Sequence, residues 1–388
     1  MLNSHNEWSP LKEVIVGSAD NYVTPEIELS FQLFYTEDST KNNFYVHPQI
    51  TASDENDSQK KEVLKRNLQV ARNSTNKYVD ELCEDIEGLV DALKKEGVKV
   101  LRPLKLQKPE KFKTPYWGST GIPALNVRDQ AIIIGNEIIE TAPILRARYF
   151  ENDLLKPVFY QYFKNNQVKW TLMPRPMMLD KSFDLSDVDE GFISRPWEDV
   201  QNQQASPYDI GFELMMDAAN CVRFGKDIIV NVSTQNHELA YQWLSKHLSS
   251  EYKLHRIFRM TDGHIDSMFL PLRPGLFLAR NPEIIKQLPE KFQKWDVVYP
   301  PEPTENIFPE YEMGDLLLTS KYIDLNLLSI NENTVVVNSL FPELVKTLEK
   351  KGFTVIPVRH RHRRIFGGGF HCFTLDTCRD SKLEDYFS

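Results

Sequence analysis

The sequence predicts an α/β fold in which one unit, two strands followed by a helix and a third strand, occurs about five times. Three observations support this prediction. The order of the elements is the same in each copy, the copies recur about every 45 residues, and turn residues separate the first two strands. Such repetition favours a closed, propeller-like ring whose units surround a central channel. Two stacked α/β domains are the alternative that the pattern leaves open.

The first unit is interrupted by a long polar segment. Residues 13–17 (EVIVG) have the composition of a strand, residues 78–96 predict a helix, and residues 98–103 (VKVLRP) predict the strand after it. Residues 26–61 are polar and poorly periodic, so we expect a mobile excursion there.

The second and third units follow the same order. Gly135-Asn136 lies between AIIIG and EIIE, which is typical of a hairpin, and a helical stretch at 145–163 leads to the strand WTLM. The third unit has strands at 228–232 (IIVNV) and 253–258 (KLHRIF) with a helix near 237–248 between them.

The last unit is the most regular. Strands are predicted at 327–330 and 334–338, an amphipathic helix at 342–351 ends at Gly352, and residues 354–358 form the closing strand. The first two strands of the fourth unit are predicted near residues 267–271 and 276–279.

Composition narrows the functional classes. The 388 residues are 41% hydrophobic, which allows one large domain or two to three ordinary ones, and the ring of repeated units favours a single domain, 1–388. The net charge of -9 would repel nucleic acid. No run of about 18 apolar residues exists to span a membrane, and the first residues do not resemble a secretory leader. No glycine-rich phosphate loop appears, so no cofactor is expected. The cysteines lack zinc spacing and are too few for a disulfide scaffold, which favours a reducing cytoplasm and no metal: Cys83, Cys221, Cys372 and Cys378.

The segment GGGFHCFTLD, residues 367–376, holds a candidate nucleophile. Its three glycines allow the backbone to approach a ligand closely, and Cys372 follows in a strand-like stretch. A cysteine placed there can attack a substrate, although a small buried hydrophobic role is the alternative.

Other segments offer a base and carboxylates. His264 and Asp266 are two residues apart, so on a strand they would face the same side. Such a histidine could raise the thiolate fraction of a cysteine. Asp217 and Asn220 could orient a histidine or bind substrate, and Asp129 at the start of a strand could project towards the centre. The alternative for each carboxylate, considered by itself, is a helix cap or a surface ion pair.

Together these segments resemble the amidinotransferase family, in the family's order and over essentially the whole chain. The resembling segments are NSHNEWSPLKEVIVG (3–17), VRDQAIIIGNEIIETAPILRARYF (127–150), DAANCVRFGKDI (217–228), HID (264–266) and GGGFHCFTLD (367–376). The resemblance implies a five-bladed α/β propeller of ββαβ units with pseudo-five-fold symmetry around a central active-site channel. It also allows a homodimer.

The resemblance implies a mechanism as well. A cysteine attacks the guanidine carbon of arginine, ornithine leaves, and the amidino-cysteine passes its amidino group to an amine. By resemblance the nucleophile is Cys372 and the general acid and base is His264. Asp129 and Asp266 would hold the guanidinium, and Ser320 would bind the donor.

The chain departs from the family pattern at two places. Asn220 stands where the family has the aspartate that orients the histidine, and asparagine gives the imidazolium no compensating charge. Asp217 would face away if a strand ran through this segment. The arginine that the family places after an Asn-Pro dipeptide, to bind the donor carboxylate, is absent, so Arg280 or Arg273 would have to replace it.

Residues 359–364 (RHRHRR) form an isolated basic run. It is either a solvated loop or a docking surface for an anionic partner, such as a phosphorylated acceptor or an acyl-carrier protein. Nucleic acid is not favoured, because the rest of the chain is acidic.

Four functional hypotheses follow. The first is an amidinotransferase that makes a guanidino compound for specialised metabolism. The second keeps Cys372 as nucleophile but transfers an acyl group from a thioester to an amine. The third is a deiminase-like hydrolase that uses water as acceptor, and the fourth is a binding protein without activity.

Overall fold

A computed structural model describes most of the chain. The described residues are 1–26, 28–36, 78–164, 167–186, 211–248, 250–261, 263–309 and 318–388. No helix among them is long and apolar enough to cross a membrane. Of the segment 26–61, residues 37–61 lie outside the described part, whereas helix α1 (Leu29–Thr36) belongs to it.

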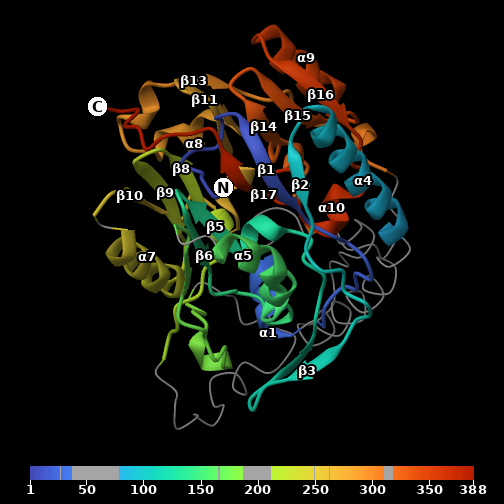
Figure 1. Cartoon of the computed structure of the whole chain (residues 1–388), viewed down its shortest axis with the longest axis vertical. Helices are drawn as coiled ribbons and strands as arrows, with labels where there is room; N and C mark the ends of the chain where they lie inside the picture. The colour runs from blue at the N-terminus through green and yellow to red at the C-terminus, as the bar shows by residue number, and fades with distance from the viewer. Residues whose placement is uncertain are drawn as a thin grey trace, which may run out of the picture.

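Five three-stranded sheets within the described residues share one topology (Figure 1). In each sheet the first strand is antiparallel to the second, and the second is parallel to the third. The parallel pair needs a crossover, and a helix supplies it, which explains the order strand, strand, helix, strand. The α/β class and the repeated unit predicted from the sequence are therefore confirmed.

Four of these units run consecutively along the chain. The first contains β5 (Ala131–Ile134), β6 (Glu137–Glu140), α5 (Lys156–Phe163) and β7 (Lys169–Leu172). The next contains β8 (Cys221–Phe224), β9 (Asp227–Val232), α7 (Gln235–Leu248) and β10 (Lys253–Phe258). It is followed by β11 (Phe269–Arg273), β12 (Leu276–Ala279), α8 (Pro282–Lys286) and β13 (Asp296–Val298). The last contains β14 (Leu328–Asn331), β15 (Thr334–Asn338), α9 (Pro342–Lys350) and β16 (Thr354–Val358).

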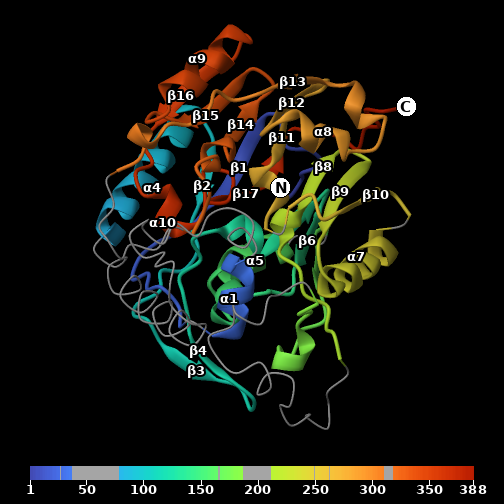
Figure 2. The same cartoon turned by 180° about the vertical axis from the view of Figure 1, so that it is seen from behind.

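The remaining unit joins the two ends of the chain. Its strands and helix are β17 (Thr374–Arg379), β1 (Leu11–Val16), α4 (Val79–Lys95) and β2 (Lys99–Leu101). Figure 1 and Figure 2 show the blue β1 beside the red β17. Val14 pairs with Asp376 across this junction, so the last strand of the chain completes the first unit. The sequence prediction had left this unit one strand short.

The segment before β5 to β7 contains a two-stranded sheet of β3 (Lys111–Lys113) and β4 (Gly118–Thr120). The single helix predicted at 145–163 is wrong. The chain there makes two short 3-10 helices, η4 (Arg146–Arg148) and η5 (Glu151–Leu154), before α5 begins with a proline in its first turn. This shortening places the side chain of Arg148 in the interior rather than along a helix surface.

A 3-10 helix precedes the first strand of each consecutive unit. These are η3 (Val127–Asp129), η8 (Ala218–Asn220), η9 (Ile265–Ser267) and η12 (Ile323–Leu325). The contacts between η3 and η8, η8 and η9, and η9 and η12 link these short helices, and η3 also contacts β17. Segments far apart in the sequence therefore meet where the units begin. Apolar clusters, for example the one shared by β5, β6, β8, β9 and α7, hold the sheets around this point.

Candidate active site

Cys372 lies in the tight turn just before β17. The expectation that it sits on a strand is wrong, because β17 begins only at Thr374. The glycines before it allow a close approach of the backbone, as expected, but to another part of the same chain. Gly367 has φ +71° and ends helix α10 (Arg363–Phe366), and a Cβ on Gly369 would lie 2.5 Å from the carbonyl oxygen of Asn326. The Asn326 side chain then accepts a 2.8 Å hydrogen bond from the backbone N–H of Cys372.

The thiol lies beside an imidazole and two carboxylates. Sγ of Cys372 is 3.5 Å from Oδ2 of Asp266. Sγ, a ring nitrogen of His264 and a carboxylate oxygen of Asp129 all lie within 4.8 Å of one another. The structure thus brings together the four residues on which the sequence hypothesis depends. A thiolate, an imidazole and a carboxylate are also donor types that bind zinc.

His264 is placed between two buried carboxylates. Its Nε2 is 3.1 Å from Oδ2 of Asp217, and its Nδ1 is 3.6 Å from Oδ1 of Asp129. The side chain keeps 12% of its surface, so solvent reaches the ring. Burial opposes the charged form of His264, but Asp129 and then Asp217 outweigh it and raise its pKa to about 9. The imidazole is therefore protonated at neutral pH.

Asp217, rather than Asn220, orients the histidine. The expectation that Asn220 would do so is wrong, because its Oδ1 accepts a hydrogen bond from Asn231 at 3.1 Å. The expectation that Asp217 faces away assumed a strand through this segment. The chain instead makes η8 before β8, with Asp217 extended at its N-cap, so the two-residue alternation does not apply. Asn220 acts only indirectly, since Asn231 also bonds the carbonyl of Thr261.

Arg148 is a site residue that the sequence reasoning missed. Its guanidinium bonds Oδ2 of Asp129 at 2.6 Å and approaches Oδ2 of Asp217 at 3.7 Å. Glu151 pairs with the same arginine at 2.6 Å. Burial raises the pKa of Glu151 to about 7, with Arg148 opposing this shift. The only sequence sign of this group was its position in the family-like segment 127–150.

The carboxylate of Asp266 is also bonded by His371, the residue that precedes Cys372. Nδ1 of His371 lies 2.7 Å from Oδ2 of Asp266. Burial alone would raise the pKa of Asp266, but the hydrogen bond from His371 prevails and lowers it. His264 and Asp266 do not share a strand as expected, because Ile265–Ser267 forms η9. The helix nevertheless leaves both side chains close to Cys372.

The charges around the thiol oppose its ionisation. Burial first, and then the negative charges of Asp266 and Asp129, raise the pKa of the Cys372 thiol well above its ordinary value. Oδ1 of Asp129 and Oδ1 of Asp266 are buried and accept no hydrogen bond from the described residues. The site therefore holds a neutral thiol beside carboxylate oxygens that still need donors.

The other residues considered from the sequence lie in different surroundings. Ser320 begins the turn into η12, and its hydroxyl accepts from the N–H of Tyr322 at 3.3 Å. Arg280 stacks its guanidinium on the Tyr322 ring at 4.3 Å, while its backbone N–H bonds Met268 at the end of η9. Arg273 instead stacks on Phe353 at 4.7 Å. Of the two arginines, Arg280 is therefore the better candidate to bind the carboxylate of a donor, because it contacts the end of η9, where Asp266 lies.

Most of the basic run 359–364 is paired within the molecule, so the interpretation as a solvated loop holds only for Arg359, whose side chain is 55% exposed. Arg361 pairs with Asp85 of α4 at 3.0 Å, and the fully buried Arg363 bonds Asp324 at 2.8 Å. His360, His362, Arg363 and Arg364 are buried. Asp85 of α4 and Asp324 pair with these arginines, which leaves Arg359 as the exposed residue of the run, so the structure gives no support to a docking surface for a carrier protein.

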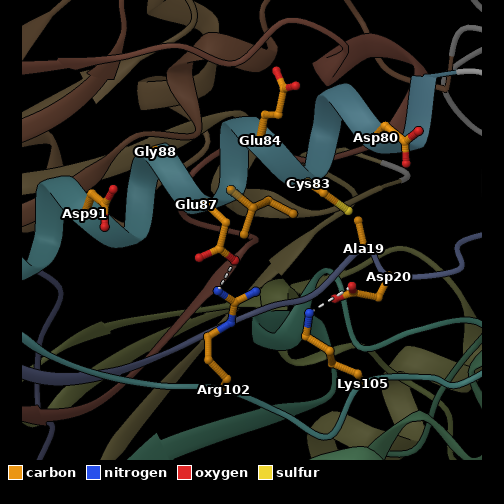
Figure 3. Close-up of a pocket in the computed structure, with 11 residues that line it drawn as sticks. Ala19, Asp20, Asp80, Cys83, Glu84, Glu87, Gly88, Asp91, Arg102 and Lys105 are labelled. Atoms are coloured by element: carbon orange, nitrogen blue, oxygen red, sulfur yellow. Dashed lines mark hydrogen bonds and ion pairs between the residues drawn. The ribbon is translucent and has the colours of Figure 1, made fainter.

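A cavity of about 620 Å³ lies away from these residues, between α4 and the segments around Asp20 and Lys105 (Figure 3). Its two cations are already paired: Arg102 with Glu87 at 2.6 Å and Lys105 with Asp20 at 3.0 Å. None of its lining residues belongs to the group around Cys372.

A thiol, an imidazole and carboxylates brought together by the starts of successive sheets form a site of the kind that performs covalent catalysis at cysteine. No family model matches the chain. The mitochondrial glycine amidinotransferase of Gallus gallus is 33% identical over 390 residues, covering 99% of this chain and 84% of that protein. The L-arginine:L-lysine amidinotransferase of Pseudomonas savastanoi pv. phaseolicola is 33% identical over 385 residues, covering 99% and 96%. The chain belongs to the amidinotransferase family, whose members are transferases.

Solved structures agree with this assignment. The inosamine-phosphate amidinotransferase StrB1 of Streptomyces griseus has a TM-score of 0.77 and 29% identity, covering 100% of this chain and 99% of that one. SxtG of Microseira wollei, an amidinotransferase of the saxitoxin pathway, has a TM-score of 0.74, 30% identity and the same coverage.

Proposed function

We propose that this enzyme transfers an amidino group from arginine to an amine through an amidino intermediate on Cys372, in the synthesis of a specialised metabolite. One observation carries the proposal: two buried carboxylates lie beside the thiol, with Oδ2 of Asp266 at 3.5 Å and an oxygen of Asp129 within 4.8 Å, and the Oδ1 atom of each accepts no hydrogen bond from the described residues. A guanidinium is planar, cationic and rich in N–H donors, so it matches paired carboxylates. Its carbon would then face the sulfur.

Donor binding would also activate the nucleophile. The charges of Asp266 and Asp129 help to raise the pKa of the thiol, and the positive charge of a bound guanidinium would offset part of that effect. The thiol then loses its proton to solvent, and the thiolate forms a C–S bond with the guanidine carbon. The protonated His264 gives its proton to the departing nitrogen as the C–N bond breaks, and ornithine leaves.

The second half of the reaction reverses these roles. Neutral His264 accepts a proton from the acceptor amine, whose nitrogen attacks the amidino carbon. The C–S bond breaks, the thiolate returns, and the guanidino product leaves. Asp217 holds the imidazole for both steps, because its bond to Nε2 fixes the ring and stabilises the imidazolium.

The charge of the site disfavours acyl transfer. A thioester carbonyl develops negative charge on oxygen during attack and needs donors there. Protonated His264 is one donor near the thiol, but Asp129 and Asp266 beside it are acceptors when ionised and make the site negative overall. A cationic carbon centre suits this arrangement, whereas an oxyanion would be repelled.

Arg280 is proposed to bind the carboxylate of the donor, and Ser320 to contact the donor nearby. Arg280 lies between the end of η9 and Tyr322, which directly precedes η12. Its guanidinium stacks on Tyr322, and Nη1 donates to Sδ of Met268 at 3.9 Å, a weak bond that a carboxylate could replace. Ser320 starts the same turn into η12.

The relatives are named for different acceptors, which bears on the part of the site that binds the acceptor amine. Relatives named for glycine, lysine and inosamine phosphate share this architecture, so the donor half of the site is common and the acceptor half varies. The likeness to an enzyme of the saxitoxin pathway supports a specialised metabolite as product.

We further propose that the five sheets are the blades of one five-bladed propeller domain. The closure of β17 onto β1 and the contacts between successive 3-10 helices support a ring. The four free cysteines support a reducing compartment such as the cytoplasm.

The test is a mass measurement on the intact protein. After incubation with L-arginine and no acceptor, the protein should gain the mass of one amidino group, release ornithine, and lose both properties in Cys372→Ser. Adding an amine panel should discharge the adduct. An absence of adduct and of ornithine with every guanidine donor would contradict the proposal. Loading by a thioester would favour acyl transfer, and a urea or citrulline product without amine would favour hydrolysis.

A further inference from the structure

The N-terminal segment NSHNEWSP places one carboxylate deep behind the site. Glu7 keeps 4% of its surface, and Nε2 of His371 lies 3.4 Å from its Oε2. The other ring nitrogen of His371 bonds Asp266. One buried imidazole therefore joins the N-terminal segment to a carboxylate that contacts the thiol.

Buried arginines hold the Glu7 carboxylate in place. Arg223 donates to both oxygens of Glu7, each at 2.8 Å. Arg128 approaches the same carboxylate at 3.4 Å and also donates to the backbone carbonyl of His371 at 2.9 Å. Asp376 accepts from both arginines, at 2.7 Å from Arg128 and 2.8 Å from Arg223. Paired charges at this depth resist displacement, because breaking one pair leaves an uncompensated buried charge.

The geometry points to Glu7 and His371 as positioning residues, which hold Asp266 so that its Oδ1 faces the guanidinium of the donor. This inference rests on the proposed function. His371 occupies Oδ2 of Asp266, so the carboxylate cannot rotate without breaking a short hydrogen bond. The same bond keeps the buried carboxyl ionised, which guanidinium binding requires. Neither residue touches the reacting atoms.

The two nitrogens of His371 can be separated by substitution. The amide nitrogen of asparagine takes roughly the place of Nδ1, whereas that of glutamine takes roughly the place of Nε2. H371N therefore keeps a donor towards Asp266, and H371Q keeps one towards Glu7. A purely structural role would make these two variants similar, and a positioning role makes them differ.

The experiment measures steady-state kinetics with separate KM values for L-arginine and for an amine acceptor. In H371Q we expect the KM for arginine to be about ten to a hundred times that of the wild type, because Asp266 loses a charge-assisted hydrogen bond. The KM for the acceptor should stay unchanged. H371N should recover most of the lost affinity for arginine, and Glu7→Gln should raise the arginine KM less than H371Q does.

Each outcome decides the matter. An arginine KM in H371Q equal to that of the wild type overturns the inference, as does an equal loss in H371N and H371Q. Thermal unfolding establishes whether each variant folds. If H371Q does not fold, Glu7→Gln decides, and an unchanged arginine KM in that variant overturns the inference. A wild type that forms no amidino adduct with any donor overturns the proposed function itself, and this failure is visible without any variant.

Discussion

Oδ2 of Asp217 lies 3.1 Å from Nε2 of His264, and Oδ1 of Asp129 lies 3.6 Å from Nδ1 of the same ring. One imidazole therefore has a carboxylate at each nitrogen, and the pKa of His264 is raised to about 9 despite burial. The ring is a proton donor throughout the neutral range and becomes a base only after it has given that proton away.

Removal of the Asp217 charge should move the alkaline limit of activity. The rate of amidino transfer from arginine should fall above about pH 9, where His264 no longer carries the proton for the leaving amine. In Asp217→Asn the pKa of His264 falls, so this limb should shift down by about one pH unit or more. The pH dependence of kcat at saturating arginine measures it, because the bound guanidinium favours the thiolate and leaves His264 to set the alkaline limb.

Asn220→Ala is the matched control. Asn220 bonds Asn231 rather than His264, so the alkaline limb should stay where the wild type has it, even if total activity declines. The assignment of Asp217 fails if the two variants shift the limb equally.

Asp266→Asn should have opposite effects on thiol reactivity and on donor binding. Asp266 is the largest charge that raises the pKa of the Cys372 thiol, so its removal should accelerate alkylation by iodoacetamide at pH 8 by about tenfold or more. The same variant should bind arginine more weakly, because the guanidinium loses a carboxylate.

Mass spectrometry of the Cys372 peptide separates this reaction from alkylation of the other cysteines. Cys83 and Cys378 are partly exposed and serve as internal references whose rates should not change. Slower alkylation of Cys372 in the variant would contradict the electrostatic account.

Arg280→Gln should weaken only donors that carry a carboxylate. We expect the KM for arginine to rise by about tenfold or more, while agmatine, a guanidine donor without that carboxylate, is used as before. Arg273→Gln is the control, because Arg273 stacks on Phe353 and bonds the carbonyl of Lys351. Equal effects on arginine and agmatine would remove Arg280 from the donor site.

Asp85→Asn should destabilise the protein. Asp85 is buried and accepts hydrogen bonds from the N–H and the guanidinium of Arg361, so loss of its charge should lower the free energy of unfolding by about 1 to 3 kcal/mol. Arg359 also donates to Asp85 at 3.1 Å, but its side chain is 55% exposed, so Arg359→Gln should cost less than about 0.5 kcal/mol. Urea unfolding at neutral pH compares the two. A cost for Asp85→Asn no larger than that for Arg359→Gln would mean that the buried bonds from Asp85 to Arg361 add no stability.

Local patterns gave the repeated unit. The strand predicted at 334–338 is β15, and the hairpin at Gly135-Asn136 joins β5 to β6, because alternation, turn residues and amphipathic helices act within a few residues of the chain. The helix predicted at 145–163 failed for the opposite reason. Arg148 is drawn into the interior by carboxylates of other segments, and no local pattern contains that attraction.

For the candidate site as well, some residues could be predicted from the sequence and others could not. Residue type and spacing offered Cys372, His264, Asp129 and Asp266 as candidates, and the resemblance of their segments to the amidinotransferase family selected them; the structure brings all four together. They were not sufficient to decide between Asp217 and Asn220. That choice depended on η8, whose 3-10 geometry replaces the alternation of a strand.

By itself, the sequence determined the α/β repeat, the acidic balance and the identity of the groups that can do chemistry, because these depend on composition and on neighbours along the chain. Only the tertiary structure decided that β17 completes the unit of β1, that Asp217 faces His264, and that Glu7 supports Asp266 through His371. Those relationships join residues from distant parts of the chain, and only the packing of the sheets brings such residues within bonding distance.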